Sequence, residues 1–344
     1  MIEVKNLTKI YGTTRAIEDL NFTIEPGIVY GFLGPNGAGK STTMNIITGC
    51  LAATSGTVTV DGHDIFADPL EAKKRIGYLP ELPPVYPDMT PTEYLTFVAR
   101  AKGVKKSESQ RQVAYAIEAT KIGDYANRLI ANLSKGYRQR VGIAQAIIGN
   151  PEVVILDEPT VGLDPQQIID IRNLIGELGK KHTVILSSHI LSEVRSVCRS
   201  VLIMARGRIV ACDTLERLEA MFSEDAGVAL SVRGKQAALT AFLGGLDFVR
   251  DCSVGAPDAA GVCALKVMAN GEDIRERLFF AFAGAGIPIL DMRAQKTDLE
   301  QVFLRLTAQA EAQDPSVVAK GISSPPTGAA ASFAQGNTKR GPEL

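Results

Sequence analysis

Several short segments of the chain consist almost entirely of apolar residues. Residues 28–33, 153–156, 184–186 and 201–204 have this pattern, and helical patterns separate the second segment from the third. A strand carries apolar side chains on both faces when both faces of its sheet are covered. The pattern therefore predicts an α/β domain built around a parallel sheet.

The segment from about residue 90 to residue 150 is different, because its apolar positions recur with a helical period. Thr90, Pro91 and Glu93 form a capping-box signature, which indicates a helix start. Further helices are expected near residues 108–120 and 135–148. Strands with alternating polarity are expected at residues 17–24 and 56–62. We therefore expect a mixed β-sheet core that carries a helical subdomain at about residues 90–150.

A second pattern begins near Gly227. Its expected elements are a strand at 228–233, a helix at 235–245, strands at 247–254 and 262–268, a helix at 271–284 and a strand at 287–293. This order is typical of a small split βαββαβ unit. A helix at 297–307 follows, and the rest is rich in Ala, Ser, Gly and Pro and is expected to be disordered. We therefore expect a first domain at 1–222, a small α+β domain at 228–307 and a disordered tail at 308–344.

Composition narrows the class of protein. The chain has 344 residues, 37 basic and 38 acidic side chains and a net charge of −1, so no global basic field points to nucleic acid. Its five cysteines are scattered and odd in number, which favours reduced thiols in a cytosolic protein. The longest apolar run, residues 279–290, is too short to span a bilayer. The N-terminus lacks the layout of a signal peptide, so we expect a cytoplasmic chain that does not cross a membrane by itself.

A glycine-rich segment lies between the apolar run 28–33 and an expected helix start at 43–47. Such a loop turns consecutive backbone N–H groups toward one point, and the helix N-terminus adds a positive dipole end. Lys40 would reach the β- and γ-phosphates of a nucleotide, and the Ser41 hydroxyl would ligate Mg²⁺. The expected phosphate-binding residues are Gly34, Asn36, Gly37, Ala38, Gly39, Lys40, Ser41 and Thr42. The alternative is a glycine-rich turn with a solvated lysine.

Two adjacent carboxylates, Asp157 and Glu158, follow the apolar run 153–156. Ligands bind at the carboxyl ends of strands in open α/β sheets. Asp157 would hold Mg²⁺ directly or through water, and Glu158 would polarise an attacking water. A solvated Asp-Glu pair at a strand end is the alternative. Ser134 stands at another expected helix start, where it would act as an N-cap or contact a phosphate.

Taken together, these motifs resemble the ATP-binding subunit of an ABC transporter over about residues 2–220. Residues 133–137 are similar to the family signature Leu-Ser-Gly-Gly-Gln, with Lys135 and Tyr137 in place of Gly and Gln. The remaining matches are the phosphate loop, Asp157-Glu158, the segment Gly162-Leu163-Asp164, the pair Ser188-His189, and Tyr11. The resemblance implies the fold of a P-loop NTPase ABC cassette, with a mixed β-sheet core plus an α-helical subdomain.

In this family two cassettes close head-to-tail over two ATP molecules. The resemblance therefore implies that Ser134 and Gly136 act across a dimer and that Asp164 lies in the loop that joins the subunits. It gives Lys40, Glu158 and His189 catalytic roles, with His189 at the γ-phosphate and Tyr11 stacked on adenine. Taken alone, His189 would be a packed or solvated histidine, and Tyr11 would be an ordinary core or surface residue.

One position departs from the family pattern. After the segment 76–80 the family has Gln, whereas this chain has Glu81. A carboxylate also ligates Mg²⁺ but adds negative charge beside the phosphates, so Glu81 would keep a metal role or face solvent. The proline-rich segment 82–89 that follows corresponds to the family's contact with its membrane partner; a loop that covers the helical region is the alternative.

The end of the second unit carries a further resemblance. Residues 297–304 are similar to a C-terminal motif of cassettes that serve ABC-2-type exporters, although an amphipathic helix with Leu299, Val302, Phe303 and Leu306 on one face explains the pattern too.

The first hypothesis is thus an ATPase subunit that uses ATP and Mg²⁺, pairs with a second cassette as a homodimer and binds a separate membrane permease. It would lie on the cytoplasmic face of the membrane and bind no nucleic acid. Rival hypotheses are a soluble ABC-type ATPase acting on ribosomes or nucleic acid, and a non-hydrolysing regulatory cassette.

Overall fold

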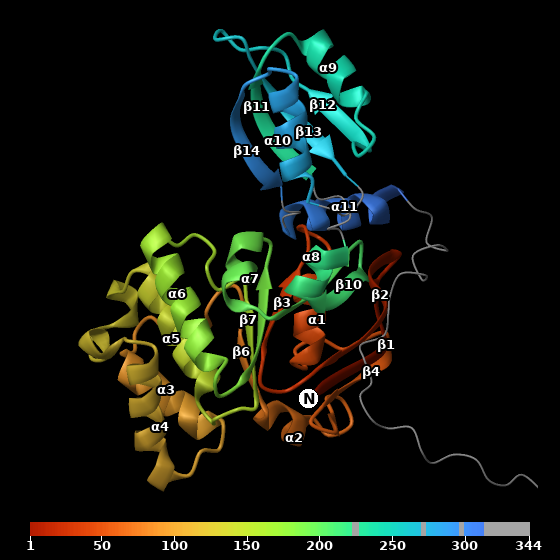
Figure 1. Cartoon of the computed structure of the whole chain (residues 1–344). Helices are drawn as coiled ribbons and strands as arrows, with labels where there is room; N and C mark the ends of the chain where they lie inside the picture. The colour runs from red at the N-terminus through yellow and green to blue at the C-terminus, as the bar shows by residue number, and fades with distance from the viewer. Residues whose placement is uncertain (222–226, 270–272, 296–298, 313–344) are drawn as a thin grey trace, which may run out of the picture.

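The computed structural model describes residues 1–221, 227–269, 273–295 and 299–312. In the first part of the chain, an antiparallel sheet has the strand order β2-β1-β4-β5. Its strands are β1 (Ile2–Tyr11), β2 (Thr14–Ile24), β4 (Ser55–Val60) and β5 (His63–Asp64). Two helices accompany it, α1 (Lys40–Ile47) and α2 (Pro69–Lys74) (Figure 1).

A second sheet of six strands forms the centre of the cassette, in the order β10-β9-β3-β8-β7-β6. All neighbouring strands run parallel except the edge pair β9 and β10. The strands are β3 (Val29–Leu33), β6 (Ile76–Leu79), β7 (Val153–Asp157), β8 (Thr183–Ser188), β9 (Ser200–Ala205) and β10 (Arg208–Thr214). Every residue of β3, β7, β8 and β9 is buried, which confirms the parallel sheet with two covered faces.

Alternate residues of β7 belong to different hydrophobic cores. Val154 and Leu156 pack with the helices on one face, whereas Val153 and Ile155 pack with the first sheet and α1 on the other. This alternation follows from the twofold period of a strand. Because β3, β8 and β7 are neighbours and parallel, the segments that follow them emerge at one edge of the sheet.

The helical subdomain lies at the side of this sheet (Figure 1) and contains α3 (Pro91–Ala101), α4 (Lys106–Ala119) and α5 (Lys135–Ile147). The capping box at its start is present, since Thr90 accepts from the backbone of Glu93 and the Glu93 carboxylate accepts from the Thr90 backbone. Short 3₁₀ turns at Gly123–Tyr125 and Ile130–Asn132 connect α4 to α5. The cassette continues with α6 (Pro165–Leu178), α7 (Leu191–Val197) and α8 (Leu215–Met221).

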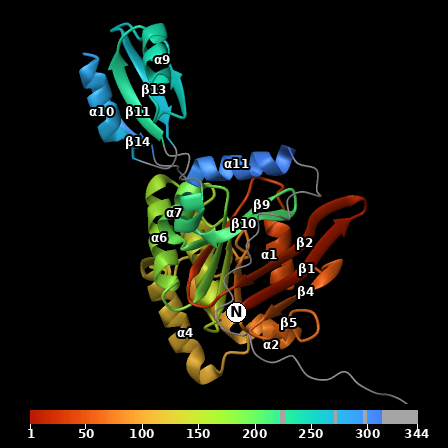
Figure 2. The same cartoon turned by 45° about the vertical axis from the view of Figure 1, so that its right-hand side comes forward.

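The small unit has its own sheet, in the order β12-β13-β11-β14, with all neighbours antiparallel. Its elements follow the expected βαββαβ order and enclose a separate core (Figure 2). They are β11 (Gly227–Arg233), α9 (Gln236–Gly244), β12 (Asp251–Val254), β13 (Val262–Met268), α10 (Arg275–Gly284) and β14 (Ile289–Gln295). Among the described residues, no helix is long and apolar enough to cross a membrane.

The last described helix, α11 (Leu299–Ala312), returns to the cassette. Val302 is fully buried in a cassette core, and Phe303 and Leu306 pack against that core. The helix contacts α7, α8, β9 and β10, so its apolar face covers the cassette and is not part of the small unit's core (Figure 2). The expected disordered tail was placed too early, because α11 runs through residue 312; residues 313–344 lie outside the described residues.

Candidate nucleotide site

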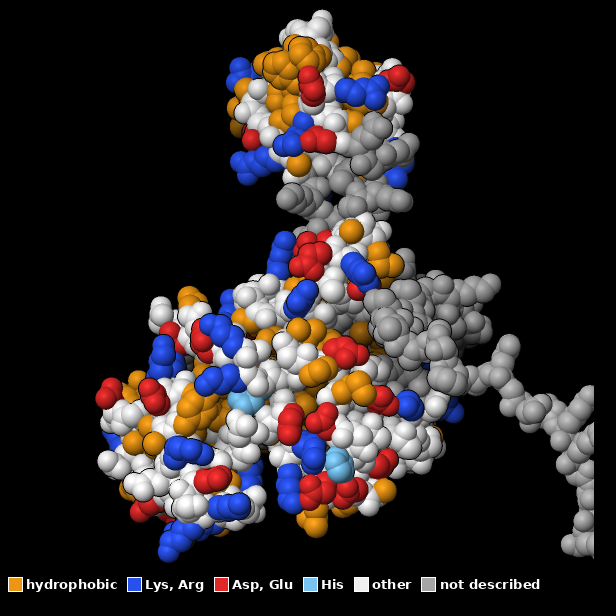
Figure 3. Space-filling view, turned by 60° about the horizontal axis from the view of Figure 1, so that its bottom comes forward, with side chains coloured by type: hydrophobic (Ala, Val, Ile, Leu, Met, Phe, Trp, Pro, Cys, Tyr) orange, Lys and Arg blue, Asp and Glu red, His pale blue; other side chains and the backbone are white. Residues whose placement is uncertain are grey.

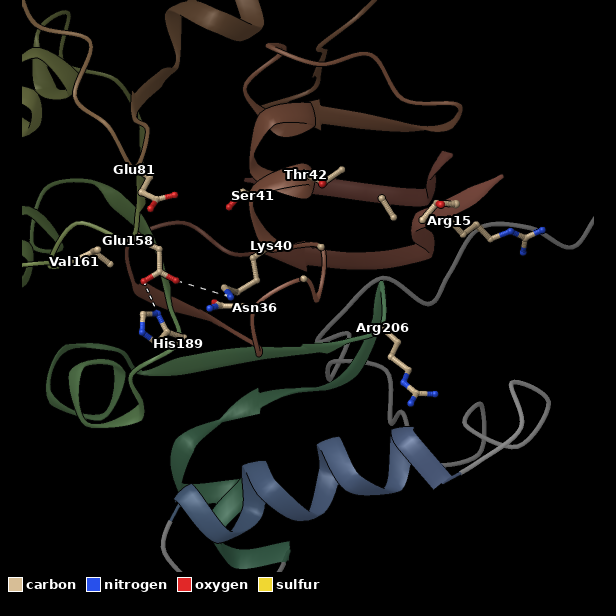
Figure 4. A pocket seen from close by; sticks show the side chains of 14 residues that line it. Arg15, Asn36, Lys40, Ser41, Thr42, Glu81, Glu158, Val161, His189 and Arg206 are labelled. Atoms are coloured by element: carbon tan, nitrogen blue, oxygen red, sulfur yellow. Dashed lines mark hydrogen bonds and ion pairs between the residues drawn. The ribbon is translucent and has the colours of Figure 1, made fainter. Parts of the chain in front are cut away.

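A cavity of about 590 Å³ opens at the carboxyl edge of the central sheet. The phosphate loop and α1 form one side, and the ends of β7 and β8 bring Glu158 and His189 to the other, as Figure 4 shows. Its lining residues are Thr14, Arg15, Ala16, Asn36, Gly37, Gly39, Lys40, Ser41, Thr42, Glu81, Glu158, Val161, His189 and Arg206. The structure thus brings together side chains that lie up to about 190 residues apart in sequence, as the strand order requires.

The conformation of the phosphate loop depends on Gly39. This residue caps α1 with φ 101° and ψ 5°, a backbone region that L side chains rarely adopt. A Cβ there would lie 2.6 Å from Ile17 Cγ2 and 2.9 Å from the Ala16 carbonyl oxygen, both on β2. The helix therefore begins at Lys40 and not at Thr43, as the sequence pattern had indicated, because the chain becomes helical directly after Gly39.

Lys40 is the buried cation of the site, with only 6% of its surface exposed. Its ammonium group donates to the carbonyl oxygens of Gly34, at 2.7 Å, and Pro35, at 3.2 Å. Its Nζ lies 3.9 Å from Glu158 Oε1. Burial lowers the pKa of Lys40, whereas the charges of Glu158 and Asp157 act in the opposite direction. Loop carbonyls and carboxylates thus hold a positive charge at the base of the cavity.

Glu158 has a strained backbone that directs its side chain into the cavity. Its φ is 48°, an uncommon value for a residue with a side chain, and its N–H donates to the Ser187 carbonyl of β8 at 3.1 Å. Its Oε2 is hydrogen-bonded to His189 Nδ1 at 2.9 Å, as the dashed line in Figure 4 marks. Since one carboxylate oxygen faces Lys40 and the other faces His189, Glu158 is fixed on two sides.

Asp157 lies deeper, with 3% of its surface exposed. Its buried Oδ1 has no hydrogen-bond partner among the residues that the structure describes, which is costly for a carboxylate unless a further group satisfies it. Burial and the charge of Asp157 raise the pKa of the neighbouring Tyr78. The Ser41 hydroxyl and the Glu81 carboxylate line the cavity and supply further oxygens. These are the ligand atoms that Mg²⁺ prefers when phosphates and waters complete its octahedron.

The described residues contain no cluster of three or more His, Cys, Asp or Glu side chains suited to a metal ion. A ready-made protein cage is therefore not part of this site. Mg²⁺ in nucleotide enzymes usually keeps waters and substrate phosphates as ligands, so a sparse set of protein oxygens fits its chemistry.

Seven of the expected residues are not among those that line the cavity: Tyr11, Gly34, Ala38, Ser134, Gly136, Asp157 and Asp164. Tyr11, at the end of β1, is 48% exposed, and Lys9 Nζ lies 5.1 Å from its ring centroid. Ser134 caps α5 by accepting from the Tyr137 backbone N–H at 3.4 Å, which is the structural role weighed for it. The Asp164 carboxylate caps α6 by accepting from the Gln167 backbone N–H at 2.9 Å. Gly136 lies against the same residue, since a Cβ on it would be 2.5 Å from the Gln167 side-chain oxygen. The starts of α5 and α6 thus lie together but away from the phosphate loop.

Sequence reasoning missed several lining residues, including Arg15, Val161 and Arg206. Arg15 belongs to β2 and is paired with Glu18, while Arg206 occupies the turn between β9 and β10. The start of β2 and the turn after β9 reach the phosphate loop only because the fold places them next to it. For Arg206 the available sequence signal was the glycine that follows it, which is typical of a turn. In the structure Arg206 and Gly207 have φ values of 49° and 76°.

Comparison with known proteins shows which family the chain belongs to. The model of the ABC transporter family matches residues 17–161. The chain is 32% identical over 313 residues to the linearmycin resistance ATP-binding protein LnrL of Bacillus subtilis, a match that covers 90% of this chain and 99% of LnrL. It is 38% identical over 212 residues to the bacitracin transport ATP-binding protein BcrA of Bacillus licheniformis, which covers 61% of this chain and 68% of BcrA.

Solved structures show the same fold. The ATP-binding subunit of an ABC transporter aligns with a TM-score of 0.59 and 31% identity, covering 64% of this chain and 93% of that chain. The cassette MJ0796, solved as a dimer in a post-hydrolysis state with ADP and Pi, aligns with a TM-score of 0.57 and 26% identity, covering 62% of this chain and 99% of that one.

The fold and the site define a P-loop ATPase of the cassette type. The chain belongs to the ABC transporter family, as an ATP-binding subunit related to those of ABC-2-type exporters. It is an ATPase whose activity powers transport, and the expected fold class and enzyme class are confirmed.

Proposed function

We propose that the cavity beside the phosphate loop binds ATP and that Glu158 acts as the general base for its hydrolysis. The observation that supports this most strongly is that Lys40 and His189 contact the two oxygens of the Glu158 carboxylate. This carboxylate lies beside the phosphate loop, whose conformation depends on Gly39. The α1 N-terminus and the loop N–H groups suit phosphate, and Lys40 supplies the countercharge. Asn36, Gly37, Ser41 and Thr42 line the same side of the cavity.

The chemistry follows from what each group does to a proton. Glu158 accepts the proton of the attacking water, and the Lys40 ammonium group, 3.9 Å from Oε1, holds one end of the carboxylate in place. His189 orients that carboxylate through Nδ1, which leaves Nε2 as the ring nitrogen free to meet the γ-phosphate. Ser41, Asp157 and Glu81 would hold Mg²⁺, which neutralises phosphate charge when bound. The unpartnered Oδ1 of Asp157 is the structural reason to include it.

We further propose that a second copy of the chain completes the site. Ser134, Gly136 and Asp164 lie off the cavity of their own chain, at adjacent helix starts, where they are available to a partner's nucleotide. The relative MJ0796 is a dimer in its solved structures, which supports this arrangement. We assign Tyr11 to adenine stacking because it lies at the end of β1 and about half of its surface is exposed, so a base can stack on its ring.

A separate membrane permease is the proposed partner, with the protein on the cytoplasmic face of the membrane. The segment after Glu81 exposes 80% of Leu82, while Pro83 packs against α5 at Gly142. A second hollow of about 390 Å³ lies between this segment and α5. A partner bound there would touch the loop that carries Glu81. Relatives named for linearmycin resistance, daunorubicin/doxorubicin resistance and bacitracin transport support export of such compounds.

Charge does not favour nucleic acid as a partner. The net charge is −1, and Figure 3 shows Lys and Arg side chains interspersed with Asp and Glu over the face it presents. A phosphate backbone is bound by a concentrated basic surface, which this face lacks.

The test of the proposed chemistry is the Glu158→Gln variant. Replacing the base should slow phosphate release from Mg·ATP by roughly two to four orders of magnitude while ATP binding is retained. Glu177→Gln, on the exposed surface of α6, is the matched control and should behave as the unaltered chain. Turnover that stays the same in the Glu158→Gln variant would remove Glu158 from this role.

A further inference from the structure

A second glutamate lies beneath the Glu158–His189 pair and is not among the residues assigned above. Glu193, on α7, is 1% exposed, which is rare for a carboxylate. Its Oε2 accepts a hydrogen bond from Thr160 Oγ1 at 2.7 Å and another from Ser188 Oγ at 3.0 Å. Both hydroxyl donors are buried as well, so the three side chains form a water-excluded cluster.

The two hydroxyls belong to the two segments that carry the catalytic pair. Thr160 comes two residues after Glu158, and Ser188 directly precedes His189. The Ser188 hydroxyl also accepts from the Ile190 backbone N–H at 3.0 Å, which fixes the turn on the far side of His189. One carboxylate oxygen thus connects the segment of the base to the segment of the histidine.

The Glu193 carboxyl group has no close cationic partner among the described residues. Arg172 Nη2 lies 4.0 Å from Oε1, and within the part of the chain that the structure describes that oxygen has no hydrogen-bond partner. Burying a carboxyl group with so few partners costs more free energy than burying an apolar side chain of similar size. A group that only filled the core would not need a carboxyl here, whereas a carboxyl oxygen can accept from the Thr160 and Ser188 hydroxyls at once.

We propose that Glu193 is a positioning residue for ATP hydrolysis, which sets the separation of Glu158 and His189 by binding Thr160 and Ser188 on one oxygen. It acts through these two hydroxyls and does not itself touch the nucleotide. The proposal rests on the catalytic roles proposed for Glu158 and His189. The Glu158→Gln measurement tests the first role separately and His189→Ala the second, because both substitutions leave the Glu193 cluster intact.

The kinetic test compares Glu193→Ala, Thr160→Val and Ser188→Ala with the control Glu177→Gln. Loss of a supporting hydrogen bond behind a reacting group typically costs about ten- to a hundredfold. We expect kcat to fall by that factor in the three cluster variants, with KM for ATP nearly unchanged. Glu193→Gln should recover part of kcat, since its amide oxygen accepts from the same hydroxyls. Because three different residues of the cluster are changed, the comparison can still be made if one of the variants fails to fold.

A double-mutant cycle separates positioning from general damage. If Glu193 acts by holding His189 against Glu158, then adding Glu193→Ala to a His189→Ala chain should cost clearly less than it does in the unaltered chain. Equal factors in the two backgrounds would show that Glu193 acts independently of His189 and would overturn the proposal.

A spectroscopic measurement gives a readout that does not need turnover. The chain has three histidines, so the His189 ring signal in an NMR spectrum is identified by its absence in His189→Ala. We expect Glu193→Ala and Ser188→Ala to shift this signal, and Glu177→Gln to leave it in place. An unmoved His189 signal, or a kcat in all cluster variants equal to that of the control, would contradict the proposal even if Glu158→Gln proved inactive.

Discussion

At the scale of single residues, two glycines of the phosphate loop share a left-handed backbone but differ in the room available for a Cβ atom. Gly37 and Gly39 both have positive φ, 80° and 101°, but a Cβ on Gly37 would meet no atom of the described residues within 4 Å. A Cβ on Gly39 would meet Ile17 and the Ala16 backbone, and Ala16 lines the cavity. The two positions therefore separate conformational strain from steric contact.

The corresponding prediction compares Gly37→Ala with Gly39→Ala. Gly37→Ala should lower the free energy of unfolding by about 1–2 kcal/mol, the usual cost of a left-handed backbone with a side chain. Gly39→Ala should lower it further and also weaken nucleotide binding, since β2 must move away from the loop. Thermal unfolding and titration with a fluorescent ATP analogue measure the two effects. Equal losses in both variants would contradict the role of the β2 contact.

A lysine outside the site is expected to make stability depend on pH. Lys102 donates to the carbonyl oxygens of Gln145, at 3.0 Å, Ala146, at 3.2 Å, and Ile148, at 2.8 Å, near the end of α5. Burial lowers the pKa of Lys102 from 10.5 to about 8. Between these values the unfolded chain binds more protons than the folded chain, so stability contributed by this residue rises with pH.

The prediction is a pH-dependent difference between the unaltered chain and Lys102→Met. Relative to the variant, the unaltered chain should gain on the order of 3 kcal/mol in unfolding free energy as pH rises from about 8 to about 10.5, at roughly 1.4 kcal/mol per pH unit. Denaturant unfolding at several pH values measures this. A difference that stays constant over the range would show that the ammonium group is not desolvated.

At the scale of elements, the sequence predicted what depends on local pattern. The buried strands β3, β7, β8 and β9 were expected from their apolar runs, and α3 from its capping box. The phosphate loop, Asp157 and Glu158 were predicted as site residues from their places at the ends of such strands, and His189 from the family resemblance and its place after one; the structure brings them together. Arg206 and Glu193 were not found, since their positions depend on which turns and helices the fold places beside the loop. No local pattern carries that information.

Helix α3 offers a test of local stabilisation. Thr90 Oγ1 accepts from the Glu93 backbone N–H at 3.3 Å, and the Glu93 carboxylate accepts from the Thr90 backbone at 2.9 Å. Thr90→Ala should lower the free energy of unfolding by about 1 kcal/mol. Thr90→Ser keeps the hydroxyl and should stay close to the unaltered chain. ATP affinity should be the same in all three, because α3 lies away from the cavity; an Ala variant as stable as the Ser variant would argue against the cap.

At the scale of the whole molecule, α11 connects the small unit to the cassette. Its pattern of apolar positions was visible in the sequence, but an amphipathic face does not specify which surface it covers. In the structure that face packs on α7, α8, β9 and β10, and α7 carries Glu193. Burial of Val302 in the cassette core means that the chain after the small unit contributes to cassette stability.

A matched pair of substitutions tests this contribution. Val302 is fully buried, whereas Leu304 is 59% exposed on the same helix. Val302→Asp should lower the unfolding free energy of the cassette by several kcal/mol, about 3 or more, because it places a carboxylate in an apolar core. Leu304→Asp should change it by less than about 0.5 kcal/mol. Similar small effects from both would mean that α11 is not docked on the cassette.

The central claim is that ATP closes two copies of this chain around the phosphate loop and that hydrolysis releases them. Light scattering on the Glu158→Gln chain, with and without Mg·ATP, tests it most directly. The predicted result is a doubling of molar mass only when nucleotide is present, and no doubling when Lys40→Ala is added. A mass that remains that of one chain at saturating ATP would contradict the claim.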